Sequence, residues 1–337
     1  MTQCRNLISD VPGLRVGNAH DADLCSGVTA VIFERQLITA MDVRGGGPGT
    51  RESDAVGLAG SLEEAHGLVL SGGSAFGLSA ATGVQSWLAE RGKGFDIGGA
   101  RVPIVPQAVL FDLLNGGNKN WGASPPYEGL ARLACDQAGL DFVLGSAGAG
   151  FGATTATLRG GLGSASATLA HGLVVGALVA VNAVGTATIG DTRHFWAAPF
   201  ERDNEFGGHG LPSPMPDGGL DFRLKGGPGA ATTIAVVATN AALTKRQAFR
   251  LAVMAQTGLA RAIYPVHTPL DGDVVFAVAT GQVTLADPIV NLTQLGSAAA
   301  NVLARAVARG VYEAAAAPPN WRGPPAWRTR FGQTGSR

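Results

Sequence analysis

The sequence predicts an α+β globular domain with a large buried core. Short apolar, β-branched runs alternate along the chain with segments of helical periodicity, which is typical of mixed folds. The chain has 337 residues, long enough for one large domain or two small ones. Hydrophobic residues make up 46% and charged residues only 15%, and this low charge indicates extensive buried surface, including surface between subunits.

The first half of the chain predicts strands, a tight turn and two helices. The strands are expected at 28–33 and 37–42, with a polar turn between them, and residues 63–70 lead into the next turn. A tight turn at 71–77 leads into a helix that carries Leu78, Val84 and Leu88 on one face and ends at Gly92. Residues 102–114 are expected to form a strand or an irregular buried segment, and residues 127–138 a short helix.

The second half predicts a hairpin, two further strands and two long helices. The hairpin spans 164–187 and turns at His171 and Gly172, whereas residues 202–231 form a long connection without periodicity. Thr244 and Gln247 have the spacing of a capping box for a helix that runs to about Ala262. A strand follows at 274–280 and an Ala-rich helix at 292–312. We expect one domain over 1–317 and a mobile tail over 318–337.

Charge and cysteine content exclude several classes of protein. Acidic and basic side chains both number 25, so the chain lacks the positive field of a nucleic-acid or anionic-membrane binder. Cys4, Cys25 and Cys135 are too few and too scattered for a disulfide framework or a metal knuckle. The first residues carry no apolar signal core, and no apolar run is long enough to cross a bilayer. We therefore expect a cytoplasmic protein without a metal or cofactor.

The segment 226–240 carries the strongest functional signal. A Gly/Pro-rich stretch ends at Thr232 and Thr233, which open an apolar, β-branched run. A cut between Ala231 and Thr232 would give Thr232 a free α-amine, whose pKa of about 7.7–8 suits a general base for its own hydroxyl. The alternative is a loop that feeds an ordinary core strand.

Two polar sites flank apolar runs and are candidates for the same chemistry. Asp271 and Asp273 stand two apart before a strand, so extended backbone would direct both carboxylates to one side. Such a pair could share a proton or hold an α-ammonium; the alternative is a solvated turn. Asn182 ends a run of nine apolar residues and could donate to an oxyanion, or could simply form a turn.

Two other motifs fail on inspection. The glycines of 148–153 match a dinucleotide fingerprint, but a Gly pair at 160–161 interrupts the helix that should follow and no acidic residue stands about 20 residues on. Ser74 is no nucleophile elbow, because Phe76 stands where that motif needs its second glycine.

Taken together, these residues resemble the self-cleaving N-terminal-nucleophile aminopeptidases, which include L-aminopeptidase/D-esterases, β-peptidyl aminopeptidases and nylon-oligomer hydrolases. The resemblance covers nearly the whole chain. It rests on blocks at 10–17, 42–46, 71–77, 102–106, 232–234 and 267–273, together with Asn182.

The resemblance implies an αββα sandwich of the type shared with ornithine acetyltransferases. It also implies a precursor that cuts itself at Ala231/Thr232 into an α chain of 1–231 and a β chain of 232–337. Thr232 would be the nucleophile and Asn182 an oxyanion contact, while Asp271 and Asp273 would orient the amine and hydroxyl of Thr232. Relatives imply a tetramer of αβ units that acts on a small peptide, amide or ester, and the Asp-Gly-Asp block resembles that of the nylon-oligomer hydrolases.

Three positions depart from the family pattern. Ala231 stands where Asn or Gly is common, Phe76 where many relatives have Tyr, and Arg159 where they carry a Lys near the nucleophile. We expect Phe76 and Thr233 to contact substrate and Arg159 to lie in the catalytic group. Two alternatives stay open: an acyltransferase of the ornithine acetyltransferase type, and an inactive oligomeric family member.

Overall fold

A computed structural model describes residues 4–225 and 231–332, so the sequence segment 226–230 lies outside the described residues. Nine strands form one continuous, bent sheet in the order β3-β7-β4-β2-β11-β10-β9-β8, with β1 also paired to β2. The strands of one half are β1 (Leu14–Asp21), β3 (Gly49–Arg51), β4 (Glu64–Ser71) and β7 (Gln107–Val109). Those of the other half are β8 (Gly161–Thr168), β9 (Val174–Val181), β10 (Ile234–Ala241) and β11 (Val274–Val283).

Strand β2 (Ser26–Val43) joins the two halves of the sheet. Its first part pairs with β1 and β4, whereas its last part pairs with β11. The register against β4 shifts between Ile32 and Leu37, which is how a bulge bends a strand from one layer into the next. The predicted turn between strands 28–33 and 37–42 is therefore wrong: the polar residues there lie in a bulge within one long strand.

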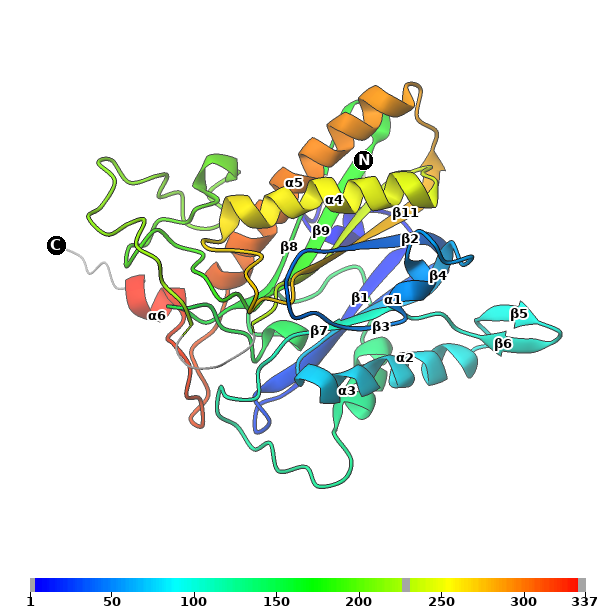
Figure 1. The fold of residues 1–337 in the computed structure, drawn as a ribbon, viewed down its shortest axis with the longest axis horizontal. Coiled ribbons are helices and arrows are strands. Elements are labelled where there is room, and N and C mark those ends of the chain that lie inside the picture. The colour runs from blue at the N-terminus through cyan, green and yellow to red at the C-terminus, as the bar shows by residue number, and fades with distance from the viewer. Residues whose placement is uncertain (1–3, 226–230, 333–337) are drawn as a thin grey trace.

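Two pairs of helices cover the outer faces of the folded sheet (Figure 1). Helices α2 (Ala80–Ala89) and α3 (Tyr127–Asp136) pack on the β1/β2/β4 half, and α4 (Lys245–Ala262) and α5 (Pro288–Tyr312) pack on the β8–β11 half. Shorter elements complete the description: α1 (Ser53–Val56), α6 (Trp327–Phe331), a hairpin of β5 (Phe95–Ile97) and β6 (Ala100–Val102), and five 3-10 turns. None of the described helices is long and apolar enough to span a membrane.

Three buried clusters separate the four layers and confirm the αββα sandwich. Strand β10 shows the arrangement, because it is buried on both faces. Ile234 and Val236 point into the cluster between the two halves of the sheet, and Ala235 and Val237 into the cluster beneath α4 and α5. A strand covered on both sides reads as a continuous apolar run rather than an alternating one. The low charge of the sequence follows from this four-layer burial.

Most predicted elements are confirmed, with shifted ends. The hairpin of β8 and β9 turns at residues 170–172, and Gly92 follows α2 in the left-handed region with φ 66°. Helix α5 begins at Pro288 rather than 292, because Asp287 caps it by accepting from the amides of Ile289 and Val290.

The C-terminal segment contacts the domain as far as residue 332, and its predicted mobility stays a prediction. Trp327 is buried and stacks on Phe195 with ring centroids 5.9 Å apart. The amide of Arg159 donates to Pro325 O at 2.8 Å, and Trp321 forms a bridge to Gly116. Aromatic side chains of this segment therefore cover apolar surface of the domain. Residues 333–337 lie outside the described part of the chain.

The capping box of α4 gives a direct test of the fold. Thr244 Oγ1 accepts a hydrogen bond from the Gln247 amide, and the Gln247 side chain accepts one from the Thr244 amide. Replacing this cap by T244A is expected to lower the free energy of unfolding by about 1 kcal/mol, since an orphan N–H is left in the first turn. Urea unfolding followed by circular dichroism measures the change.

Thr257 provides the matched control in the same helix, because its exposed hydroxyl bonds only to the Met254 carbonyl within the helix. T257A should leave the unfolding midpoint nearly unchanged. Equal effects of T244A and T257A would contradict the capping role.

Candidate active site

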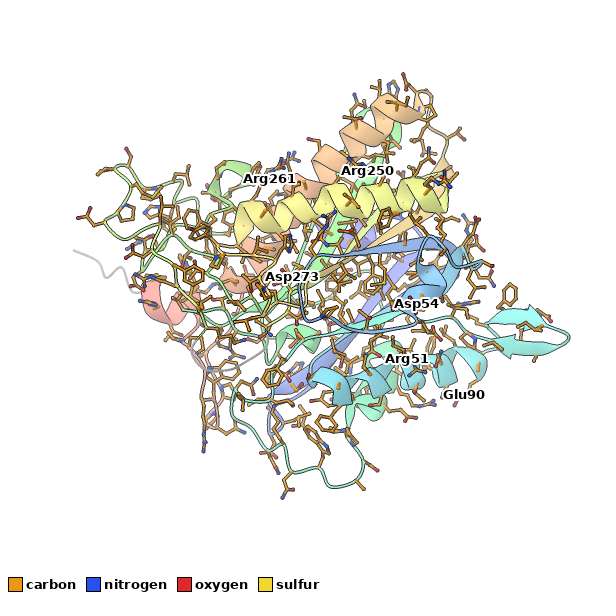
Figure 2. All side chains as sticks on the ribbon, viewed as in Figure 1. Arg51, Asp54, Glu90, Arg250, Arg261 and Asp273 are labelled. Carbon is orange, nitrogen blue, oxygen red and sulfur yellow. The ribbon has the colours of Figure 1, made fainter. Side chains whose placement is uncertain are left out.

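Three strand ends meet at one edge of the β8–β11 half. Strand β10 runs antiparallel to β9 and parallel to β11, with Ile234 opposite both Ala180 and Val274. This topology brings the end of β9 beside the starts of β10 and β11. Asn182, Thr232 and the Asp271–Asp273 turn, predicted separately from the sequence, therefore lie together. In the view of Figure 2, Asp273 lies on the side of the molecule where α4 ends.

The peptide bond between Ala231 and Thr232 is held at both of its polar atoms. The Thr232 amide donates to the Asn182 carbonyl at 2.7 Å, and the Ala231 carbonyl accepts from the Gly272 amide at 2.8 Å. The Ala231 amide in turn donates to Leu270 O at 3.0 Å. Both residues are buried. The bond is thus fixed in place, with a hydrogen-bond donor aimed at its carbonyl oxygen.

Gly272 is required at its position by its neighbours. A Cβ there would lie 2.7 Å from Thr232 Oγ1 and 2.5 Å from the carbonyl oxygen of Gly47. The Thr232 hydroxyl therefore lies directly over the backbone of the Asp-Gly-Asp turn. Sequence analysis singled out the two carboxylates and missed the amide of the glycine between them, because a backbone donor leaves no trace in residue type.

Asp271 accepts three hydrogen bonds from the surrounding backbone and from Thr268. Its partners are the Val184 amide at 3.1 Å, the Thr268 amide at 2.9 Å and the Thr268 hydroxyl at 2.8 Å. Burial raises the pKa of Asp271, and the negative charge of Asp273 raises it further. The negative charge of Asp273 thus favours the protonated form of Asp271.

Asp273 organises the residue next to the candidate nucleophile. Its carboxylate accepts from the Thr233 amide at 2.8 Å and from the His267 amide at 3.1 Å, and Nδ1 of the same histidine lies 2.9 Å away. Among the described residues, neither Asp271 nor Asp273 forms a hydrogen bond with Thr232 itself. The direct orientation of Thr232 by these carboxylates stays a prediction; what they fix in this structure is the backbone around it.

The side-chain amide of Asn182 is fully buried and bonded at both ends. Its Oδ1 accepts from the Thr154 amide at 3.0 Å and from Lys225 Nζ at 2.8 Å, and its Nδ2 donates to the Phe111 carbonyl at 3.0 Å. Burial lowers the pKa of Lys225 to about 8, although the charges of Asp112 and Asp271 pull it upward. Lys225 was not predicted from the sequence; its one signal there is a basic side chain directly before the glycine-rich stretch.

The structure does not bring Arg159 into this group. Its guanidinium donates to the carbonyls of Phe151 at 2.8 Å, Ala315 at 3.2 Å and Ala316 at 3.0 Å, and lies 4.3 Å from the ring centre of Trp321. Burial lowers its pKa to about 10, so the group is still charged at neutral pH. Arg159 thus anchors the C-terminal segment, and its place in the catalytic group stays a prediction without a contact to Thr232 among the described residues.

The two predicted substrate contacts lie in different surroundings. Phe76 is 51% exposed and packs edge-on against Trp121, with ring centroids 5.4 Å apart. Thr233 is fully buried, and its hydroxyl has no hydrogen-bond partner among the residues that the structure describes. Contact of either side chain with substrate stays a prediction.

A cavity of about 320 Å³ opens beside Asn182. Three of its lining residues, Phe111, Thr154 and Lys225, are the ones bonded to the Asn182 side chain. A larger cavity of about 560 Å³ lies at α5 around Arg202 and Arg305, away from Thr232. Within 4–225 and 231–332, no cluster of three or more His, Cys, Asp or Glu side chains could hold a metal ion.

The loop 45–47 packs against the Asp-Gly-Asp turn and offers a second test. A Cβ at Gly45 would lie 2.2 Å from the Asp273 nitrogen and 2.4 Å from Asp271 O, whereas at Gly47 the nearest atom is 3.8 Å away. G45A should lower the free energy of unfolding by about 1–3 kcal/mol, because backbone atoms must move. G47A should have little effect. Urea denaturation of both variants measures the difference, and a tolerated G45A would contradict this packing.

This chain is similar to known proteins over most of its length. The model of peptidase family S58 matches residues 6–320. An uncharacterised aminopeptidase of Mycobacterium tuberculosis is 41% identical over 92% of this chain and 94% of its own length. A 6-aminohexanoate-oligomer endohydrolase of a Kocuria strain is 30% identical over 88% of this chain and 84% of its own.

Solved structures agree in fold. An L-aminopeptidase/D-Ala-esterase/amidase of Ochrobactrum anthropi, described as a variant of the Ntn-hydrolase fold, superposes with a TM-score of 0.71 at 20% identity, covering 99% of this chain and 96% of that one. A Burkholderia β-aminopeptidase gives 0.70 at 20% identity, covering 98% and 95%. The resemblance stated from the sequence is confirmed: this chain belongs to peptidase family S58.

Proposed function

We propose that this amide hydrolase matures by cutting itself between Ala231 and Thr232 and then uses Thr232 as its N-terminal nucleophile. The observation that carries the proposal is that both polar atoms of the Ala231–Thr232 peptide bond are fixed by hydrogen bonds. Its carbonyl accepts a hydrogen bond from Gly272 and its amide donates to Asn182, with the Thr232 hydroxyl beside them. A threonine hydroxyl has few rotamers available, which keeps the attacking oxygen near the carbonyl carbon.

The first stage converts the peptide bond into an ester and then breaks it. Thr232 Oγ adds to the Ala231 carbonyl carbon, and the Gly272 amide, 2.8 Å from the carbonyl oxygen, stabilises the developing oxyanion. The hydroxyl proton passes to the Thr232 nitrogen as the C–N bond breaks, which leaves an ester between residues 231 and 232. Water then hydrolyses the ester, giving a carboxylate on Ala231 and a free hydroxyl and α-amine on Thr232.

The second stage uses the newly formed amine. The carbonyl of Asn182, at 2.7 Å from the nitrogen of Thr232, can keep holding that nitrogen after the cut. With a pKa of about 7.7–8, the amine can take the hydroxyl proton at neutral pH. The oxygen then attacks a substrate carbonyl, and the Thr232 ammonium returns its proton to the leaving amine or alcohol as the C–N or C–O bond breaks and an acyl-enzyme forms. Water releases the acyl group and restores Thr232.

The remaining polar groups support these steps. We assign Asn182 Nδ2 as an oxyanion donor, since one of its two N–H bonds is not used by Phe111. Asp271 and Asp273 hold the turn and Thr233 in place, and together they supply negative charge that favours an ammonium at Thr232. The cavity beside Asn182 is the proposed entry for a small peptide, amide or ester. Assembly into a tetramer, the cytoplasmic location and the lack of nucleic-acid or membrane partners stay predictions.

Self-cleavage is tested by the mass of the purified chain. Wild type should give two fragments, residues 1–231 and 232–337, in place of the intact 34.1 kDa chain. T232A removes the attacking oxygen, so it should stay intact and lose all hydrolase activity. T232S retains a hydroxyl and should still cut. Intact-mass spectrometry checks all three proteins, and a cut T232A chain would rule out this nucleophile.

Product analysis separates substrate classes. We expect hydrolysis of an aminoacyl-p-nitroanilide by the cut protein, with free amino acid as product and no dependence on an added acyl acceptor. A panel that adds a β-dipeptide and a 6-aminohexanoate oligomer compares this chain with the activities named for its relatives. Transfer of acetyl from N-acetylornithine to an amine, without hydrolysis of the panel, would contradict the assignment in favour of an acyltransferase.

A further inference from the structure

Lys225 is bonded directly to the Asn182 side chain. Its Nζ donates to Asn182 Oδ1 at 2.8 Å and lies 3.3 Å from Thr154 O, while its own backbone amide donates to Val184 O at 2.9 Å. The residue stands in the part of the chain just before the proposed cut, so it would belong to the α chain. Neither self-cleavage nor hydrolysis, as derived above, assigns it a role.

The bonds of the Asn182 amide show what Lys225 does there. Two donors, the Thr154 amide and the Lys225 ammonium, face Oδ1, and one acceptor, Phe111 O, faces Nδ2. Turning the amide over would set its NH₂ group against both donors and its oxygen against a carbonyl. The surroundings therefore accept one orientation only. In that orientation one N–H of Nδ2 is not committed to Phe111, and it can donate to a reacting carbonyl.

We propose that Lys225 is a positioning residue for amide cleavage at Thr232: its ammonium fixes the Asn182 side chain in the orientation that offers Nδ2 as a donor, and polarises it. A charged donor on Oδ1 makes a stronger bond than a neutral one and draws electron density away from Nδ2, which strengthens the remaining N–H as a donor. The inference rests on the proposed function and adds a residue to it.

The charge of Lys225 depends on its surroundings. Among the described residues, the carboxylates of Asp112 and Asp271 act on it electrostatically, and Asp112 and Arg322 line the same cavity as Lys225. Burial outweighs the two carboxylates and lowers the pKa of Lys225 to about 8. The ammonium is therefore present at pH 7 and is lost as the pH rises through about 8. A neutral amine bonds Oδ1 more weakly, so the contribution of Lys225 should disappear over the same pH interval.

Self-cleavage gives the cleanest measurement, because Thr232 has no α-amine before the cut that could titrate in the same pH range. Full-length chain made by cell-free translation is transferred to buffers from pH 6 to pH 10, and the uncut fraction is followed by intact mass. Wild type should slow above about pH 8. K225M should cut at least roughly tenfold more slowly at pH 7. This is a part of the roughly 10²–10³-fold fall in rate found when a whole oxyanion donor is removed. The cleavage rate of K225M should also no longer fall above pH 8.

Two further variants separate positioning from a general effect on folding. K225R retains a permanent charge, so it should cut measurably faster than K225M and show no decline up to pH 10. K245M removes another lysine that bonds backbone carbonyls, here those of Gly60 and Leu62, and it should behave as wild type. In the mature enzyme K225M should lower kcat and change KM by less than about twofold.

The possible outcomes distinguish the two proposals. A K225M chain that cuts like wild type at every pH overturns the role of Lys225 and leaves self-cleavage intact. Should K225M not fold, K225R carries the test, and an alkaline decline identical to wild type overturns the role. A wild-type chain that never cuts overturns self-cleavage itself, and the role of Lys225 in it falls with it.

Discussion

The position of one peptide bond between three strand ends determines the rest of this site. The bond before Thr232 lies between the end of β9 and the turn before β11, and its amide and carbonyl each form a hydrogen bond with one of them. This requires β10 to be flanked by one antiparallel and one parallel neighbour. With two antiparallel neighbours, the Asp-Gly-Asp turn would stand at the far end of the sheet. The strand order is thus a condition of the chemistry.

Local sequence patterns predicted what local physics decides. The Thr244 cap, the turn at His171 and the strand that opens after Thr232 each depend on neighbours within a few residues, and all were found near their expected places. The sequence did not predict the long bulged strand β2 as one strand, because polar residues in a bulge have the same composition as those in a turn. What decides between the two is pairing with β4, which is distant in the chain.

The site was predictable in its side chains and not in its backbone. A polar residue beside an apolar run is unusual, which is why the sequence singled out Thr232, Asn182 and the two aspartates. The structure places these four residues together. The Gly272 amide and the Asn182 carbonyl were invisible, since every residue carries these groups. The same limit holds for the basic side chains. The family resemblance favoured Arg159, but its guanidinium donates to carbonyls of the C-terminal segment. Lys225, which the sequence did not single out, donates to the Asn182 side chain instead.

The hydrogen bonds of the two aspartates do not depend on the peptide bond between Ala231 and Thr232. Asp271 accepts from Val184 and Thr268, and Asp273 from Thr233 and His267. Neither carboxylate uses the Ala231 carbonyl or the Thr232 amide. If the proposed cut occurs and Ala231 moves away, its hydrogen bonds with Leu270 and Gly272 are lost, whereas the bond of the Thr232 nitrogen with the Asn182 carbonyl does not involve Ala231. The Gly272 amide is then free to bind another carbonyl where Ala231 had been. The same donor would serve first the chain's own peptide bond and then the substrate's, which accounts for a mature site that is assembled before maturation.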